Sequence, residues 1–305
     1  MLRYFVSKLG LALLVALTVS SISFLLVFAA GDPAIAIAGE NATAEDVQAV
    51  REFYGYDRPL VVQYGSWLWG VLHGDFGVST YFNQPVSSLI GPRLAVTMTL
   101  GFLSIALALA ISIPLGVLAA MRPNSALDRI ALSIAVFGQA IPNFWMGLLL
   151  IMFFSIHLGI LPASGTDSWK SFVMPMIVLG TSATPAIMRL TRTGMIEVLG
   201  SDYVRTARAK GLPQRKILFK HALRNAVIPV VSLAAVQLGF LLGGSVVVES
   251  VFALNGAGYA AWQSISRNDL PTMQALILIF SMFYIFFNLL ADVLNAWLDP
   301  RLRGN

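Results

Sequence analysis

Residue types that could carry out catalysis are few in this chain, and their spacing fits no catalytic set. The three histidines, His73, His157 and His221, fall in three separate parts of the sequence, and cysteine is absent. Neither a His-Glu-x-x-His metal motif nor a Gly-x-x-x-x-Gly-Lys-Ser/Thr phosphate loop occurs. Ser245 follows two glycines in an apolar segment that holds no histidine to act as its base, which favours helix packing through small residues. The sequence therefore predicts no catalytic residue, no metal site and no intramembrane hydrolase.

Ionisable residues within apolar segments would indicate proton or ion coupling. The centres of the apolar segments contain none, and Glu249 and Asp292 are placed near segment ends. No internal repeat of the kind that builds secondary carriers is visible either. A proton-coupled secondary carrier, the alternative class of protein, is therefore disfavoured, and the energy source is expected on another protein.

Polar residues in or beside the apolar segments are candidates for a translocation path. They are Gln139, Asn143, Gln237 and Glu249. An amide side chain in a membrane helix can face a pore, or it can form a hydrogen bond to a neighbouring helix. The sequence leaves both interpretations open for the three amides.

The segment 189–224 is strongly basic, with nine Lys and Arg residues. Ser201 is suited to cap a short helix, Asp202 favours its N-terminal end, and Gly211 can close it. Pro213 then suits the first turn of a second helix. The pattern predicts two short helices with exposed basic faces, although such a charge cluster can also serve only to fix topology beside lipid headgroups.

The elements that position these residues are long apolar helices. Hydrophobic residues make up 57% of the 305 residues and charged residues only 11%, against about 25% charged in soluble domains. Six blocks without charge are long enough to cross a bilayer, and they cover residues 9–29, 94–121, 130–165, 171–188, 225–248 and 270–291. The third is too long, so its helix is expected to end near His157. The predicted fold is an all-α integral membrane protein with six transmembrane helices, kinked in places by proline.

The N-terminal block contains 21 uncharged residues, more than the 7–15 of a cleaved signal peptide, so a retained helix is favoured. If the N-terminus is cytoplasmic, the loops on that side carry fifteen of the twenty Lys and Arg residues. The positive-inside rule then predicts that both termini and the segment 189–224 are cytoplasmic. The net charge of +5 is thus explained by a lipid membrane, and no nucleic-acid partner is predicted.

Three regions follow from this topology: the N-terminal tip and first helix at 1–30, an extracytoplasmic insertion at 31–93, and a five-helix core at 94–305. In the insertion, Thr43 and Asp46 have the spacing of a capping box, Gly55 would end that helix, and Pro59 could open the next. The insertion could be a surface cap or a docking surface for an outside partner, and the sequence leaves both open.

Several strings in the chain resemble one protein family. Residues 202–212 read DYVRTARAKGL, residues 221–226 read HALRNA, and Ile228 and Pro229 follow. Further matches are AGDP at 30–33, HGDFG at 73–77, IPLG at 113–116, GGSVVVE at 243–249 and LDPR at 298–301. Together they resemble the inner-membrane permeases of bacterial ABC importers for peptides and nickel. Arg205, Thr206 and Ala207 stand where the wider superfamily has Glu-Ala-Ala, and this departure itself resembles the peptide and nickel branch.

The resemblance implies a division of labour between several proteins. This chain and a second homologous permease would form the pore, an extracytoplasmic binding protein would deliver a peptide or peptide-like solute, and two cytoplasmic ATPases would hold ATP and Mg²⁺. The chain itself would need no cofactor. A nickel chelate or another small solute is the alternative cargo. The residues expected to couple the permease to the ATPases are Asp202, Tyr203, Arg205, Thr206, Ala207, Arg208, Ala209, Lys210 and Gly211.

Overall fold

The computed structural model describes residues 2–29, 31–39 and 42–298, and all regular elements within these ranges are helical. Five helices are long and apolar enough to cross a membrane, and the number rises to six if a bent pair of helices is counted as one span. The predicted all-α membrane fold is thereby confirmed. Backbone N–H and C=O groups in a bilayer need partners within the same segment, and helices provide them.

The chain forms two compact units. The insertion unit covers 2–97 and 255–285, and the core unit covers 98–254 and continues from residue 286. The insertion unit contains α1 (Leu2–Ala29), α2 (Pro33–Ala38), α3 (Ala44–Tyr54), α4 (Leu60–Leu72), the start of α5 (Val86–Met121), α13 (Ala257–Ser266) and the start of α14 (Leu270–Leu298).

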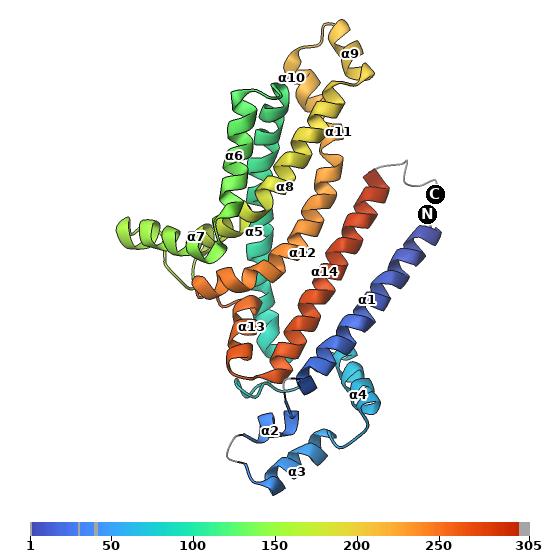
Figure 1. Cartoon of the computed structure of the whole chain (residues 1–305), viewed down its shortest axis with the longest axis vertical. Helices are drawn as coiled ribbons and strands as arrows, with labels where there is room; N and C mark the ends of the chain where they lie inside the picture. Colours follow the sequence, from blue (N-terminus) through green and yellow to red (C-terminus); the bar gives the residue numbers. More distant parts are fainter. Residues whose placement is uncertain (1, 30, 40–41, 299–305) are drawn as a thin grey trace. The chain divides into compact units, whose positions relative to one another are not determined.

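The core unit contains the remainder of α5 and α14 together with the helices from α6 to α12 (Figure 1). These are α6 (Ala126–Ala140), α7 (Asn143–Leu150), the π-helix η1 (Ile151–His157), the 3₁₀-helix η2 (Trp169–Phe172), α8 (Val173–Leu199), α9 (Asp202–Ala209), α10 (Gln214–Lys216), the π-helix η3 (Ile217–Ala222), α11 (Leu223–Ala226) and α12 (Ile228–Val251).

The third apolar block is not the single helix that the sequence predicted. It bends by 96° between α6 and the continuous pair α7 and η1, and the steep angle is visible in Figure 1. Ile141 leaves helical geometry with φ −79° and ψ 126°. The cause is Pro142, which has no N–H to donate and whose ring disfavours the helical conformation of the residue before it. The expected end near His157 is correct, since η1 ends there.

Glycine allows α5 and α8 to approach closely in the core unit. A Cβ atom on Gly116 would lie 2.7 Å from Cβ of Thr191 and 2.9 Å from the carbonyl oxygen of Met188. Nearby, the hydroxyl of Ser112 donates to the carbonyl oxygen of Thr184 at 2.9 Å. Small residues thus let two membrane helices pack backbone to backbone, as is usual where lipid removes the hydrophobic driving force.

The predicted capping box begins α3 in the insertion unit. The backbone N–H of Asp46 donates to Thr43 Oγ1 at 3.2 Å, and the backbone N–H of Thr43 donates back to Asp46 Oδ2 at 2.9 Å. Hydrogen bonds from the Thr43 hydroxyl and backbone hold the pKa of Asp46 below its usual value. Gly55 ends the helix in the left-handed region with φ 72°, and α4 starts directly after Pro59.

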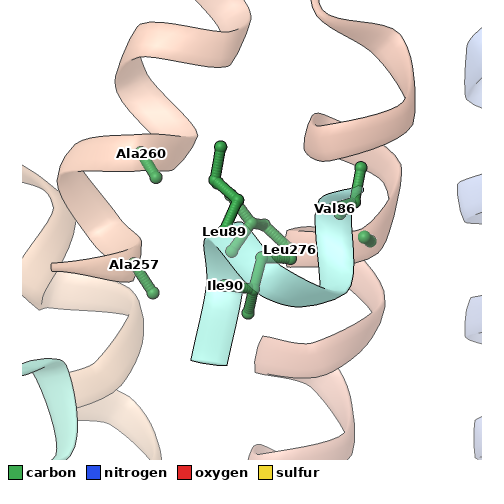
Figure 2. Packing of buried hydrophobic residues seen from close by; sticks show 7 residues of the cluster. Val86, Leu89, Ile90, Ala257, Ala260 and Leu276 are labelled. Atoms are coloured by element: carbon green, nitrogen blue, oxygen red, sulfur yellow. The ribbon is translucent and has the colours of Figure 1, made fainter. Parts of the chain in front are cut away.

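A small apolar cluster holds α5, α13 and α14 together in the insertion unit. Figure 2 shows Leu89 and Ile90 of α5 directed toward Ala257 and Ala260 of α13 and toward Leu276 of α14. All five side chains are at most 4% exposed. The alanines are one helical turn apart, so α13 presents a flat face on which the larger α5 side chains pack.

Asp269 fixes the loop that follows α4 within the same unit. Its fully buried carboxylate accepts hydrogen bonds from the Ser79 hydroxyl at 2.5 Å and from the Thr80 backbone N–H at 3.1 Å. The Ser79 oxygen in turn accepts from the backbone N–H of Phe82 at 2.8 Å. A buried carboxylate requires such donors, and these bonds hold the loop in place.

Candidate coupling site and translocation path

A short helical hairpin follows α8: its first arm is α9, and its second arm is the run of α10, η3 and α11 up to Ala226. The first arm begins at the predicted position. Ser201 has the extended geometry of an N-cap, with φ −71° and ψ 154°. Its hydroxyl, however, donates to the carbonyl oxygen of Val198 at 2.6 Å and accepts no hydrogen bond from the first turn. The side-chain cap expected at Ser201 is therefore wrong. The acidic Asp202 in the first turn still stabilises the positive end of the helix dipole.

Gly211 closes α9 as predicted, with a left-handed φ of 72°. Two hydrogen bonds complete the turn: the backbone N–H of Gly211 donates to the carbonyl oxygen of Arg208 at 2.9 Å, and that of Leu212 donates to the carbonyl oxygen of Ala207 at 3.3 Å. This pair of bonds defines a Schellman motif, and Leu212 packs against the hairpin interior as the motif requires.

The interior of the hairpin is a small cluster of Val204, Ala207 and Ile217, all at most 7% exposed, with Val198 packed against it. Ala207 is one of the residues expected to couple the permease to the ATPases, but its side chain points into this cluster and not outward. The helical period explains the difference, because Val204 and Ala207 are three residues apart and share the inward face of α9. Ala209, by contrast, is exposed.

The opposite face of α9 is open and predominantly basic; we call it the outer face. It consists of the exposed residues Asp202, Tyr203, Arg205, Thr206, Arg208, Ala209 and Lys210. Arg205 Nη1 lies 3.2 Å from Asp202 Oδ1, but both side chains are at least 79% exposed, so this ion pair stabilises the helix only weakly. The outer face therefore offers its guanidinium groups and amine to another molecule.

Apolar contacts fasten the hairpin to the long helices of the core unit. Leu218 and Ala222 of η3 are buried against Met195 of α8 and Val117 of α5. A Cβ on Gly194 would lie 3.1 Å from the carbonyl oxygen of Ala226, so α8 and α11 are also in close contact. In Figure 1, α9 and α10 lie beyond the end of α8. A force on the outer face would thus be passed to α5 and α8 through packed side chains.

A polar link between Tyr203 and Asn225 joins the two ends of the hairpin. The Asn225 amide donates to the Tyr203 hydroxyl at 2.8 Å, and it also donates to the carbonyl oxygen of His221 at 3.3 Å. Tyr203 remains 45% exposed, so its ring still belongs to the outer face. Of the residues predicted to couple, Tyr203 is thus the one that also bonds across the hairpin.

The ion pair of Asp128 and Arg192 was missed by sequence reasoning. Arg192 Nε and Nη2 donate to the two carboxylate oxygens of Asp128, each at 2.6 Å. The backbone N–H of Asn124 adds a third bond at 2.8 Å, and the Asp128 side chain is only 3% exposed. Bidentate guanidinium–carboxylate pairs are the strong, directional kind, so this one clamps the start of α6 to α8.

The residues predicted to line a translocation path differ in exposure. Gln139 is exposed and Asn143 half-buried, and they flank the 96° bend between α6 and α7. Gln237 is half-buried in the middle of α12. Glu249, in contrast, is fully buried inside the core unit. Contrary to the prediction, Glu249 does not lie on an open surface of this chain, whereas the three amides remain accessible for a path.

An all-α chain with six potential spans and a basic hairpin beyond the end of two of them has the architecture of a membrane permease. Residues 112–304 match the family described as "Binding-protein-dependent transport system inner membrane component". Residues 1–101 match the family described as "Binding-prot-dependent transport system membrane comp, N-term". The chain belongs to this family: it is a multi-pass inner-membrane permease of an ABC importer, in the class for peptides and nickel.

Curated relatives agree with this assignment, and solved structures share the fold. The chain is 41% identical over 304 residues to the "Glutathione transport system permease protein GsiC" of Escherichia coli (strain K12), and the match covers 99% of each chain. The same values hold for the GsiC protein of Salmonella typhimurium (strain LT2). The fold is similar to that of the MetNI methionine ABC transporter, with a TM-score of 0.58 at 22% identity over 69% of this chain and 96% of the other. The fold is also similar to that of an amino acid ABC transporter, with a TM-score of 0.53 at 17% identity over 69% of this chain and 94% of the other.

Proposed function

We propose that the chain forms half of the translocation path for peptides or peptide-like solutes, together with a second homologous permease. An extracytoplasmic binding protein delivers the solute, and two ATP-binding subunits dock on the outer face of α9 and on its counterpart. Similarity to a glutathione permease along the whole chain supports this class of cargo. The observation that carries the proposal is the hairpin itself, which exposes a basic face and is packed firmly against α5 and α8.

The proposed orientation places both termini and the hairpin in the cytoplasm. It rests on the excess of Lys and Arg in the loops on that side of the membrane. ATP and Mg²⁺ then belong to the docked subunits, and this chain contributes no catalytic group to hydrolysis. The insertion unit faces the binding protein on the other side.

In this mechanism the hairpin acts as a rigid lever. ATP binds more tightly to one arrangement of the ATP-binding subunits than to the other, and this difference in binding free energy shifts the permease between its two states. The lever must not deform when it is pulled. The Schellman turn, the buried cluster around Ile217 and the bond from Asn225 to Tyr203 meet that requirement.

Because the chain has no cysteine, single cysteines report directly on the proposed docking and orientation. Thr206→Cys places a thiol on the outer face, and Asn83→Cys places an exposed thiol in the insertion unit. A membrane-impermeant maleimide should label Asn83→Cys in intact cells and Thr206→Cys only after permeabilisation. The assembled ATP-binding subunits should then protect Thr206→Cys from labelling. Labelling of Thr206→Cys in intact cells would overturn the orientation, and equal labelling with and without those subunits would overturn the docking.

Cargo is tested in proteoliposomes that contain the complete importer with its binding protein. Glutathione, a dipeptide and a nickel chelate are offered separately, and ATP-dependent uptake of each is measured. The proposal requires uptake of at least one of the two peptide-like solutes. Uptake of the nickel chelate alone would leave the architecture intact and refute the proposed cargo.

A further inference from the structure

The insertion unit contains a cavity of about 350 Å³, which lies in the lower part of the size range of small-molecule sites. It is formed by the last turns of α1, Ile37 of α2, the segment from the end of α3 through α4, the turn that follows α4, and the first two turns of α14. Aromatic rings supply much of its wall, namely Phe24, Phe28, Tyr56, Trp67 and Phe76. The wall is therefore suited to a flat or bulky apolar group.

Gln63 lines this cavity and has an unpaired acceptor. Its Nε2 donates to the carbonyl oxygens of Tyr56 at 3.1 Å and of Arg58 at 2.6 Å, and these two bonds fix which end of the amide is nitrogen. Its Oε1 is buried and has no hydrogen-bond partner among the described residues. The residue lines the cavity, so a donor placed there could satisfy this oxygen.

Gln274, in the first turns of α14, presents the complementary group. The residue is 7% exposed and lines the same cavity, and its Nε2 has no hydrogen-bond partner in the described part of the chain. A buried amide that lacks a partner destabilises the fold, so natural proteins rarely keep one without a reason. The cavity thus combines one unpaired acceptor, one unpaired donor and aromatic walls.

We propose that this cavity is a binding site for a small amide-bearing molecule with an aromatic or bulky apolar group, of the size of a blocked amino acid. The amide of such a ligand accepts from Gln274 Nε2 and donates to Gln63 Oε1, while its side group packs on the aromatic wall. A hydrocarbon chain would satisfy neither glutamine, and so the pair of amides favours a polar ligand. The inference concerns the insertion unit alone and does not depend on which solute the importer carries.

Trp67 makes this proposal measurable by fluorescence. The probe is N-acetyl-4-nitro-L-phenylalanine amide, whose nitrophenyl ring quenches tryptophan at short range, added to the complete importer in lipid nanodiscs. Saturable quenching is expected in the wild type and in Trp69→Phe, which replaces a 67% exposed ring two residues along the same helix. It should disappear in Trp67→Phe, which removes the reporter inside the cavity.

The role of the amide is tested with Gln274→Leu, a substitution of similar size that removes the unpaired group and is not expected to weaken the fold. It should weaken the binding of the probe roughly three- to tenfold, the range that one net hydrogen bond gives. Gln48→Leu, an exposed change on α3 outside the cavity, should have no effect.

Five results would overturn the proposal. Quenching that does not saturate, or that persists in Trp67→Phe, would show that the quenching does not come from a ligand in the cavity. Equal binding by Gln274→Leu, or by 4-nitrotoluene in place of the probe, would show that the amide is not recognised. Quenching of Trp67 by lipids with brominated acyl chains, without competition from the probe, would show that a lipid chain occupies the cavity instead.

Discussion

Replacing Gly211 by alanine is the sharpest test of the hairpin as a lever. Gly211 has φ 72°, and a Cβ atom built there would meet no atom within 4 Å. The penalty therefore comes from the backbone alone, and a left-handed L-residue costs about 1–2 kcal/mol. The two Schellman hydrogen bonds form only when residue 211 is left-handed. A penalty of this size therefore lowers the ratio of molecules with the turn formed to molecules with it broken roughly 5- to 30-fold.

A matched substitution in the same region isolates this effect. Gly200, which ends α8, has an ordinary φ of −82°, and its added Cβ would lie no closer than 3.5 Å to any atom. Gly200→Ala and Gly211→Ala change the unfolded chain in the same way, so the entropic gain common to glycine replacements cancels in the comparison. The left-handed turn is the main difference that remains between the two variants.

Hydrogen exchange of the Leu212 amide reports the turn directly, and ATP-dependent uptake by the reconstituted importer reports its consequence. In Gly211→Ala the Leu212 amide should exchange roughly 5- to 30-fold faster, and uptake per ATP hydrolysed should fall. Gly200→Ala should resemble the wild type in both measurements. If Gly211→Ala exchanges at the wild-type rate, the strain argument is refuted; if it exchanges faster but transports normally, the lever argument is refuted.

Three further predictions concern the packing of the core unit. Ala209→Trp on the outer face should leave the thermal stability of the permease unchanged but prevent copurification of the ATP-binding subunits. Ala207→Trp should overfill the interior of the hairpin and lower the free energy of unfolding by about 1–3 kcal/mol. The reverse pattern would place docking on the other face of α9. Asp128→Asn should lower stability by about 3 kcal/mol in denaturant titrations and Arg192→Lys by less, and equal stability in all forms would refute the clamp. Gly116→Leu should prevent stable insertion, and normal yield in membranes would show that α5 and α8 can separate at little cost.

Local sequence signals predicted the ends of several helices correctly. The capping box at Thr43, the left-handed ends at Gly55 and Gly211, and the helix after Pro59 all depend on residues within a few positions of each other. Such signals act through one or two backbone groups, so a single residue type is sufficient to specify them. Apolar block length likewise predicted the membrane fold, because every span needs a minimum length to cross the bilayer.

Predictions that depended on the direction of a side chain were less accurate. The spacing of Val204 and Ala207 places both on one face of α9, but only the structure shows that this face packs inward and that Ala209 lies outside it. Glu249 was predicted on an open path from its polarity alone, yet tertiary packing buries it completely. The break at Pro142 was open to prediction, but proline is also tolerated within membrane helices, and only the structure separates a kink from a 96° turn.

The clamp between Asp128 and Arg192 shows why a charge count alone conceals part of the site. Both residues lie near ends of apolar segments, where charge is expected for topology and needs no partner. They are 64 positions apart, so no local spacing connects them. Yet a carboxylate that is 3% exposed must be paired, and its two bonds to Arg192 join the start of α6 to the same α8 that carries the hairpin. A force on α9 would therefore act on α6 as well as on α5. The bend at Pro142 lies at the opposite end of α6 from the clamp. If the hairpin acts as the proposed lever, its movement should therefore reach Gln139 and Asn143 through the clamp and α6.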